Sequence, residues 1–124
     1  MTTTAVQKVN IHEKMSVFTD HWSPHILGEL NGQHVKAVKL LGEFVWHHHE
    51  QEDELFLVIK GNLKMEFRDK TIMLTAGEFI IVPRKTEHKP VADELVEILL
   101  FEPVSTLNTG NIVNERTQKN LDRI

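Results

Sequence analysis

Three histidines and one glutamate stand at spacings that suit a shared metal ion. His47 and His49 are two residues apart. Side chains on a β-strand alternate between faces, so both imidazoles point to one side, about 7 Å apart along the chain, while His48 points away. Glu54 follows a short acidic loop and brings a carboxylate beside them, and His88 lies just beyond a proline turn as the fourth candidate ligand.

The donor set predicts one divalent transition-metal ion as the cofactor. Imidazole nitrogen and carboxylate oxygen suit manganese, iron, nickel, copper, zinc or cobalt better than calcium or magnesium. The chain contains no cysteine, which excludes thiolate sites, iron–sulfur clusters and disulfides. Four protein ligands leave one or two coordination positions open, as a catalytic site requires. Glu54 is the candidate catalytic residue, because a carboxylate ligand can both tune the ion and shuttle a proton.

The segments that must position these ligands have the pattern of short antiparallel strands. Each apolar or alternating run ends in Gly, Pro, Asn or Asp, which is typical of a sandwich or barrel. Asn31-Gly32 favours a two-residue turn, and Gly61 is expected to close a hairpin between the strands on either side of it. The expected strands are residues 26–30, 34–41, a run after Gly42 into the histidines, 55–59, 63–67, 71–75, 79–82 and 94–101.

The segments outside these strands carry weaker signals. A short helix is expected only near Glu13 or Arg116, because no other stretch has a helical apolar pattern. Residues 111–124 are polar and are predicted to form a frayed or partner-bound tail. Residues 20–25 are rich in aromatic and imidazole groups, and we expect them to cover a neighbouring subunit. Trp46 and His48 face away from the ligands and are expected at such a contact, so a homodimer is predicted.

Bulk properties limit the classes of function. A chain of 124 residues fits one domain, with a core at about residues 26–102 between an N-terminal arm and a C-terminal tail. Hydrophobic residues make up 40% and charged residues 26%, as in ordinary globular proteins. The net charge of −4, with basic residues spread along the chain, predicts no nucleic-acid partner. Without a signal sequence or an apolar span, a cytoplasmic protein with no membrane association is expected.

Two motifs around the ligands resemble those of the cupin family, in particular the small single-domain cupins similar to mannose-6-phosphate isomerase. The first, GEFVWHHHEQEDELFLVIKG, spans residues 42–61, and the second, GEFIIVPRKTEHKPVA, spans residues 77–92. The sequence departs from the family pattern by one residue fewer after the first glycine, by Lys85 in place of glycine and by Ala92 in place of asparagine. Lys85 therefore either changes the turn before His88 or carries a positive charge toward the pocket.

The resemblance implies an all-β domain with a double-stranded β-helix, a jelly-roll-like barrel that holds the metal near one open end. Cupins include dioxygenases and sugar isomerases, so the expected function is that of a metalloenzyme acting on a small organic molecule. A phosphosugar activity is disfavoured, because the short chain leaves no room for the extra helices of those enzymes. The alternatives are a non-catalytic small-molecule or metal sensor, and a barrel that merely folds around its ion.

The walls of the pocket can be predicted only from strand alternation. By this argument Phe56, Met65, Phe79 and Phe101 point toward the pocket. Lys85, together with its neighbour Arg84, either holds an anionic substrate or simply decorates a turn. A pocket with such walls predicts a small molecule, bound as ligand or substrate, as the partner of this protein.

Overall fold

The computed structural model describes residues 5–124 and shows one short helix and seven strands among them. The elements in chain order are α1 (Ile11–Met15), β1 (His25–Leu30), β2 (Gln33–Glu43), β3 (Glu54–Lys60), β4 (Asn62–Phe67), β5 (Thr71–Thr75), β6 (Phe79–Val82) and β7 (His88–Pro103). No helix in this part of the chain is long and apolar enough to cross a membrane.

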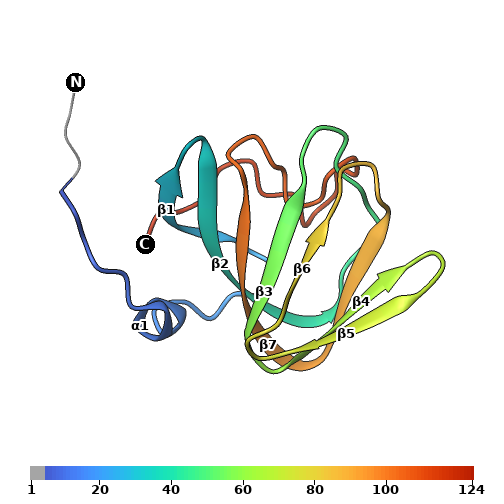
Figure 1. The fold of residues 1–124 in the computed structure, drawn as a ribbon, viewed down its shortest axis with the longest axis horizontal. Coiled ribbons are helices and arrows are strands. Elements are labelled where there is room, and N and C mark those ends of the chain that lie inside the picture. Colours follow the sequence, from blue (N-terminus) through green and yellow to red (C-terminus); the bar gives the residue numbers. More distant parts are fainter. Residues whose placement is uncertain (1–4) are drawn as a thin grey trace.

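The long strand β7 joins two layers of antiparallel strands. Its first residues pair with β4, and its later residues pair with β2 on one side and β3 on the other. One layer therefore has the order β1-β2-β7-β3-β6, and β4 with β5 extends the other, at the lower right of Figure 1. The two layers close around a common interior. This arrangement confirms the all-β, jelly-roll-like barrel expected from the sequence.

Several predicted elements differ from those observed. The tight turn at Asn31 and Gly32 joins β1 to β2 as expected. The predicted hairpin around Gly61 is wrong, because β3 and β4 each pair with β7 and not with each other. Gly61 has a φ of 93°, and a Cβ there would lie 2.7 Å from the carbonyl oxygen of Leu95. Only glycine lets the chain pass so close to β7 as it moves from one layer to the other.

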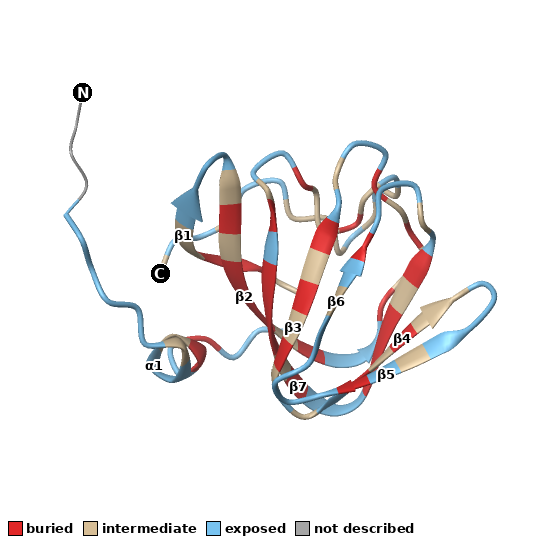
Figure 2. Ribbon diagram, in the orientation of Figure 1, coloured by how far each residue is buried: buried red, intermediate tan, exposed pale blue. Residues whose placement is uncertain are grey.

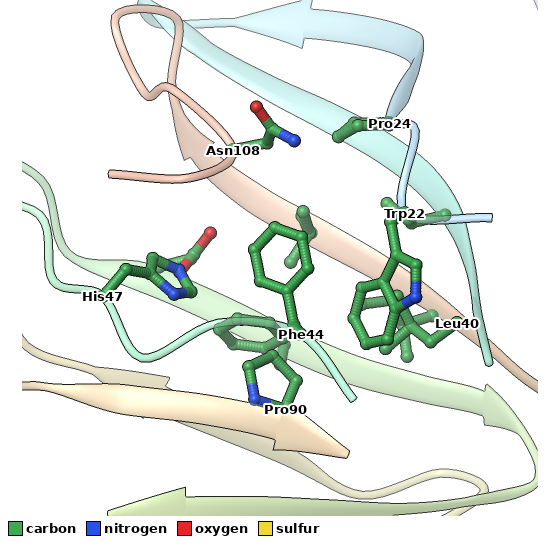
Figure 3. A pocket seen from close by; sticks show the side chains of 12 residues that line it. Trp22, Pro24, Leu40, Phe44, His47, Pro90 and Asn108 are labelled. Atoms are coloured by element: carbon green, nitrogen blue, oxygen red, sulfur yellow. The ribbon is translucent and has the colours of Figure 1, made fainter. Parts of the chain in front are cut away.

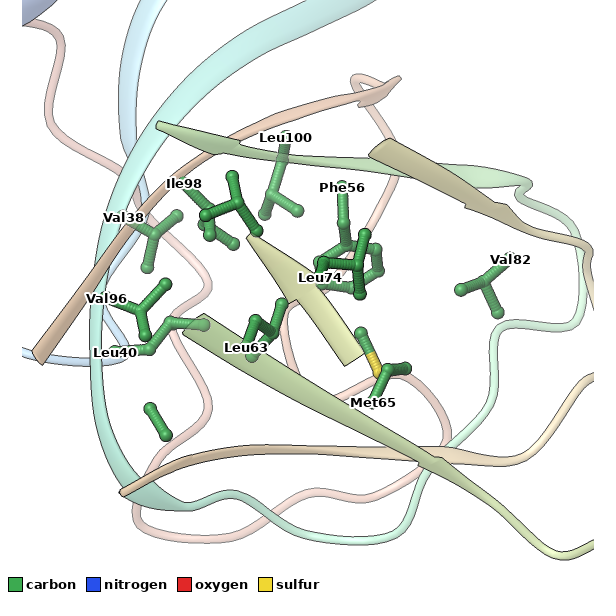
Figure 4. Close-up of a cluster of buried hydrophobic side chains, with 12 residues drawn as sticks. Val38, Leu40, Phe56, Leu63, Met65, Leu74, Val82, Val96, Ile98 and Leu100 are labelled. Carbon is green, nitrogen blue, oxygen red and sulfur yellow. The ribbon is translucent and has the colours of Figure 1, made fainter. Parts of the chain in front are cut away.

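The hydrophobic core fills the space between the layers (Figure 4). Alternate residues of β2 and β3 point inward, which produces the banded burial along both strands in Figure 2. Leu63 and Met65 on β4 are fully buried on the opposite wall. The complete cluster consists of Val38, Leu40, Phe56, Val58, Leu63, Met65, Leu74, Val82, Ala92, Val96, Ile98 and Leu100.

The N-terminal helix covers the outside of the barrel. Asn10 caps α1 by accepting a hydrogen bond from the backbone N–H of Glu13, at 2.9 Å. Met15 at the end of α1 and the following Phe18 pack against Leu99 on the outer face of the sheet. The helix expected near Glu13 is confirmed, whereas the region of Arg116 forms turns.

The C-terminal residues do not form the frayed tail that their polarity predicted. The backbone N–H of Ile26 donates to the carbonyl of Asp122 at 2.8 Å, and that of Ile124 donates to the carbonyl of Ile26 at 3.1 Å. The chain end therefore lies beside β1 (Figure 1). The buried side chain of Thr109 bonds within the same segment, to the carbonyl of Ile112. Polar composition was misleading because these residues satisfy one another by hydrogen bonds rather than by apolar burial.

Burial predicts a clear contrast between two leucines on the barrel. Leu63→Ala removes side-chain atoms from a fully buried position and should lower the free energy of unfolding by about 2–5 kcal/mol. Leu95→Ala, at a position that is 41% exposed, should change it by no more than about 0.5 kcal/mol. Urea denaturation of both variants measures the two values, and equal losses would contradict the assignment of Leu63 to the core.

Candidate metal centre

The histidine segment is tied to the barrel by backbone hydrogen bonds. The predicted strand through the histidines is wrong, because β2 ends at Glu43 and the following residues form an extended connection. His47 and His88 nevertheless form an isolated bridge, in which each backbone N–H donates to the other's carbonyl, at 3.1 and 2.9 Å. The N–H of Lys85 also donates to the carbonyl of His49 at 2.7 Å. These bonds bring ligands from the two motifs together.

The C-terminal loop holds the same segment from its other side. The N–H of His48 donates to the side-chain oxygen of Asn111 at 2.9 Å, and the N–H of Asn111 donates to the carbonyl of His48 at 3.0 Å. Gly110 makes this approach possible, because a Cβ there would collide with the carbonyl of His48 and lie 3.1 Å from the ring of His47. The supposed tail is therefore part of the support of the site.

Four buried side chains converge at the centre of this arrangement. One ligand atom from each of His47, His49, Glu54 and His88 lies within 4.8 Å of the others. The Oε1 atom of Glu54 is 3.2 Å from Nε2 of His49 and 3.4 Å from Nε2 of His88. All four side chains are at most 4% exposed. The structure thus brings together the whole predicted ligand set, while His48 turns away.

The hydrogen bonds around the imidazoles fit a metal ion. Nδ1 of His47 lies 2.9 Å from the carbonyl of Val45, and Nδ1 of His88 lies 2.9 Å from the carbonyl of Thr86. A carbonyl oxygen can only accept a hydrogen bond, so Nδ1 carries the proton and Nε2 presents its lone pair inward. Nε2 of His88 and of His49 and Oε1 of Glu54 are buried without a hydrogen-bond partner among the described residues. Buried polar atoms rarely stay unpartnered, and a shared cation would satisfy all of them.

A second buried carboxylate and a lysine lie behind Glu54. Glu102 on β7 and Lys36 on β2 are each 1% exposed, and Lys36 Nζ donates to Oε2 of Glu102 at 2.6 Å. The pairing of Leu55 with Phe101 places Glu54 and Glu102 next to each other across the strands. This pair was not predicted from the sequence. A signal was present, because Glu102 continues the inward row of Ile98 and Leu100 on β7.

The two carboxylates are driven to opposite protonation states. Burial and the neighbouring Glu54 raise the pKa of Glu102 well above its ordinary value. Burial would also raise the pKa of Glu54, but its contacts with Glu102, His49 and His88 outweigh burial and hold that pKa well below the usual range. Two adjacent buried carboxylates cannot both be charged without a large cost. Glu54 is therefore the anion at neutral pH, and Lys36 balances the charge that the pair carries.

A narrow apolar cavity opens beside His47 and Glu54 (Figure 3). The cavity volume is small, about 40 Å³, and the empty space rises to about 380 Å³ when the solvent at its open mouth is included. Trp22 and Phe44 form an aromatic wall, with their rings stacked at a centroid distance of 4.8 Å. The full lining comprises Trp22, Pro24, Val38, Leu40, Phe44, His47, Glu54, Phe56, Pro90, Ile98, Leu100 and Asn108.

Comparison with known proteins agrees with this geometry. The sequence model of the cupin domain matches residues 34–101, more than half of the chain. The chain belongs to the cupin family. Residues 34–101 contain all four candidate ligands as well as Lys36, whereas Trp22 and Asn108 lie outside the matched segment.

Two solved cupin-like structures and one curated protein are similar to this cupin. A cupin-2 domain protein from Shewanella frigidimarina NCIMB 400 is 46% identical with a TM-score of 0.76, over 77% of this chain and 93% of that one. Protein NMB1881 from Neisseria meningitidis is 26% identical with a TM-score of 0.72, over 78% and 99%. The uncharacterized protein YdbB of Bacillus subtilis (strain 168) is 39% identical over 64 residues, which are 51% of this chain and 57% of YdbB.

The predicted pocket residues are only partly where alternation placed them. Phe56 lines the cavity of this cupin, and Met65 is buried in the core without lining it. Phe79 and Phe101 do not line this cavity, and they are 58% and 36% exposed on the outside of the sheet, where Phe101 borders a separate outer groove. The alternation was assigned to the wrong face on β6 and β7, where the inward residues next to them are Ile80 and Leu100.

Lys85 keeps the turn of the family although it is not glycine. Its φ is 66°, the left-handed conformation that glycine adopts most easily. Its side chain lines an outer groove between β4 and β6, so its prediction as a cavity residue is wrong. Arg84 is also outside, with Nε 3.3 Å from Oδ1 of Asp53 in an exposed ion pair. Neither of the two motif cations lines the cavity beside His47.

The aromatic residues near the motifs also have different neighbours from those predicted. Trp46 lies on the outer surface, where the guanidinium carbon of Arg68 stacks 3.9 Å from the centroid of the indole ring. Trp22 was expected to cover a neighbouring subunit, but it closes the cavity of its own barrel. His25, in the same stretch, pairs with Asp20 at 2.9 Å. The homodimer stays a prediction.

Removing the cation behind the ligands should destabilise the apoprotein. Lys36→Met leaves the negative charge shared by Glu54 and Glu102 buried without its partner, so the free energy of unfolding should fall by about 3–5 kcal/mol. The matched substitution Lys64→Met breaks only the surface pair with Asp93, at 3.9 Å, and should cost at most about 1 kcal/mol. Chemical denaturation in the presence of a chelator measures both, and equal costs would contradict the proposed charge balance.

Burial of His47 predicts an acid sensitivity of the apoprotein. Burial, and then repulsion from His88, lowers the pKa of His47 to about 4 from the model-compound value of 6.5. Between these values the unfolded chain binds a proton that the folded chain does not, so stability falls as the pH falls. Relative to His47→Gln, wild-type apoprotein should lose up to about 3 kcal/mol between pH 6.5 and pH 4. Parallel pH profiles of the two proteins would contradict a neutral, buried His47.

Proposed function

We propose that this cupin is a metal-dependent enzyme that acts on a small organic molecule by dioxygenase- or isomerase-type chemistry. The proposed ion is a divalent transition metal with His47, His49, Glu54 and His88 as its ligands. The observation that carries the proposal is the meeting of unpartnered ligand atoms at one wall of an apolar cavity. A purely structural ion needs no cavity beside it, whereas a substrate needs both the space and an open coordination position.

Each residue of the site has a defined part in this proposal. A bound ion of this kind supplies Lewis acidity toward an oxygen atom of the substrate. The carbonyls of Val45 and Thr86 fix the orientation of the His47 and His88 rings. Glu54 is ionised and stands at the cavity wall, where its carboxylate can accept or return a proton of the substrate. The apolar lining keeps water away from this exchange.

Metal content is the first test of the proposal. The wild-type protein, purified without a tag, should contain about one transition-metal ion per chain by elemental analysis. His49→Ala should lose it, with a fall in affinity beyond the roughly 10–100-fold that loss of an outer support causes. His48→Ala is the matched control, because the His48 ring lies toward Glu50 and not toward the ligands. Equal metal content in the two variants would remove the proposed centre.

Substrate assays then separate the two reaction types from mere binding. Oxygen uptake with flavonols, β-diketones and catechols tests the dioxygenase branch, and aldose–ketose interconversion tests the isomerase branch. Turnover that His49→Ala abolishes and His48→Ala retains would support the proposal. Tight binding of a ligand without turnover in either assay would instead favour a sensor module.

A further inference from the structure

The cavity beside the candidate centre carries little polar chemistry of its own. Apart from His47 and Glu54, the only polar side chain in its lining is that of Asn108. That amide is partly used, because its nitrogen donates to the carbonyl of Arg116 at 2.8 Å and its oxygen accepts from the N–H of Gln118 at 2.8 Å. Among the described lining residues outside the ligand set, Asn108 therefore offers a ligand at most one further N–H and one further lone pair.

The nearby cations are unavailable to a ligand in the cavity. Lys36 is paired with Glu102 and does not line the cavity. The guanidinium of Arg116 lies 5.8 Å from the ring centroid of Trp22, and it donates to the carbonyl of Glu43 at 2.6 Å. Neither cation is a lining residue. A phosphate or a second carboxylate on the ligand would thus be buried without a counter-charge, which costs several kcal/mol.

The aromatic wall is held rigidly in place. Trp22 has a φ of 60°, which is rare for a bulky residue and costs energy. Two hydrogen bonds maintain it: its backbone N–H donates to the carbonyl of Lys39 at 2.8 Å, and its indole N–H donates to the carbonyl of Leu41 at 2.9 Å. The ring therefore stacks against Phe44 with an interplanar angle of 19° and borders the cavity (Figure 3). Such a rigid, flat surface suits a flat ligand.

We propose that the ligand of this cavity is a small planar phenol or enol, with its oxygen atoms at one end and no charged group elsewhere. The inference rests on the proposed function, because it assigns the oxygen end to the metal centre at His47 and Glu54. The remainder of the molecule lies against Trp22, Phe44 and the branched aliphatic side chains of the barrel. Sugars and phosphosugars are disfavoured as ligands, because most of their hydroxyl groups and charges would lose water without gaining partners.

Indole fluorescence of the zinc-loaded protein tests this assignment without relying on turnover. The chain has two tryptophans, and Trp46 stands outside the barrel beside Arg68. In a Trp46→Phe background, emission reports on Trp22 alone. Catechol should change that emission on titration, and calorimetry should give the same dissociation constant in the Trp46→Phe protein and in wild type. Mannose 6-phosphate and succinate should neither change the emission nor compete.

Variants of the aromatic wall complete the test. Trp22→Ala should weaken catechol binding about tenfold or more, consistent with the loss of one aromatic contact. Phe44→Leu, a milder change at the same wall, should weaken it less, with zinc content unchanged in both variants. Tighter binding of mannose 6-phosphate or succinate than of catechol, or unaltered catechol binding by both wall variants, would overturn this inference while the metal centre stands. Absence of zinc binding by wild type would overturn the proposed function and this inference together.

Discussion

The burial of charge at one end of the barrel constrains the rest of this structure. Glu54 and Glu102 stand side by side on β3 and β7, almost without solvent, and an uncompensated pair of this kind would not remain folded. Lys36 on β2 supplies one positive charge, and the unpartnered Nε2 atoms of His49 and His88 leave room for a cation. The three central strands of the large layer must therefore keep their register. A shift of one residue would turn these charges outward and expose the core residues that follow them.

The same register places the candidate metal ligands next to the apolar cavity. Along β2, β3 and β7 the inward rows pass from polar residues at one end to apolar residues at the other. Lys36 is followed inward by Val38, Glu54 by Phe56, and Glu102 is preceded by Leu100. These rows alone therefore give the cavity between them a polar end and an apolar end. The candidate centre and the selectivity proposed for it thus follow from one alternation pattern.

The sequence predicted which four side chains meet, because the two motifs place these residue types at short range. The approach of His47 to Glu54 needs only the connection after β2 and one short loop, and His88 follows a proline turn. The prediction was weaker wherever long-range packing decides the outcome. The hairpin at Gly61 failed because β7 pairs with both of its arms, and Phe79 was assigned to the interior although β6 presents it outside. No local pattern reveals which of two apolar faces a sheet buries.

Segments near the two ends of the chain complete the cavity and support the site, although neither motif includes them. Trp22 comes from the segment before β1, and Asn111 comes from the loop after β7, yet one forms the cavity wall and the other anchors the histidine segment. Both lie outside residues 34–101, the part that matches the cupin domain. A relative can therefore share the barrel and its metal ligands while a different end segment gives its cavity another shape and polarity. What the cavity of this cupin can bind is thus better inferred from the residues around Trp22 and Asn108 than from membership of the family.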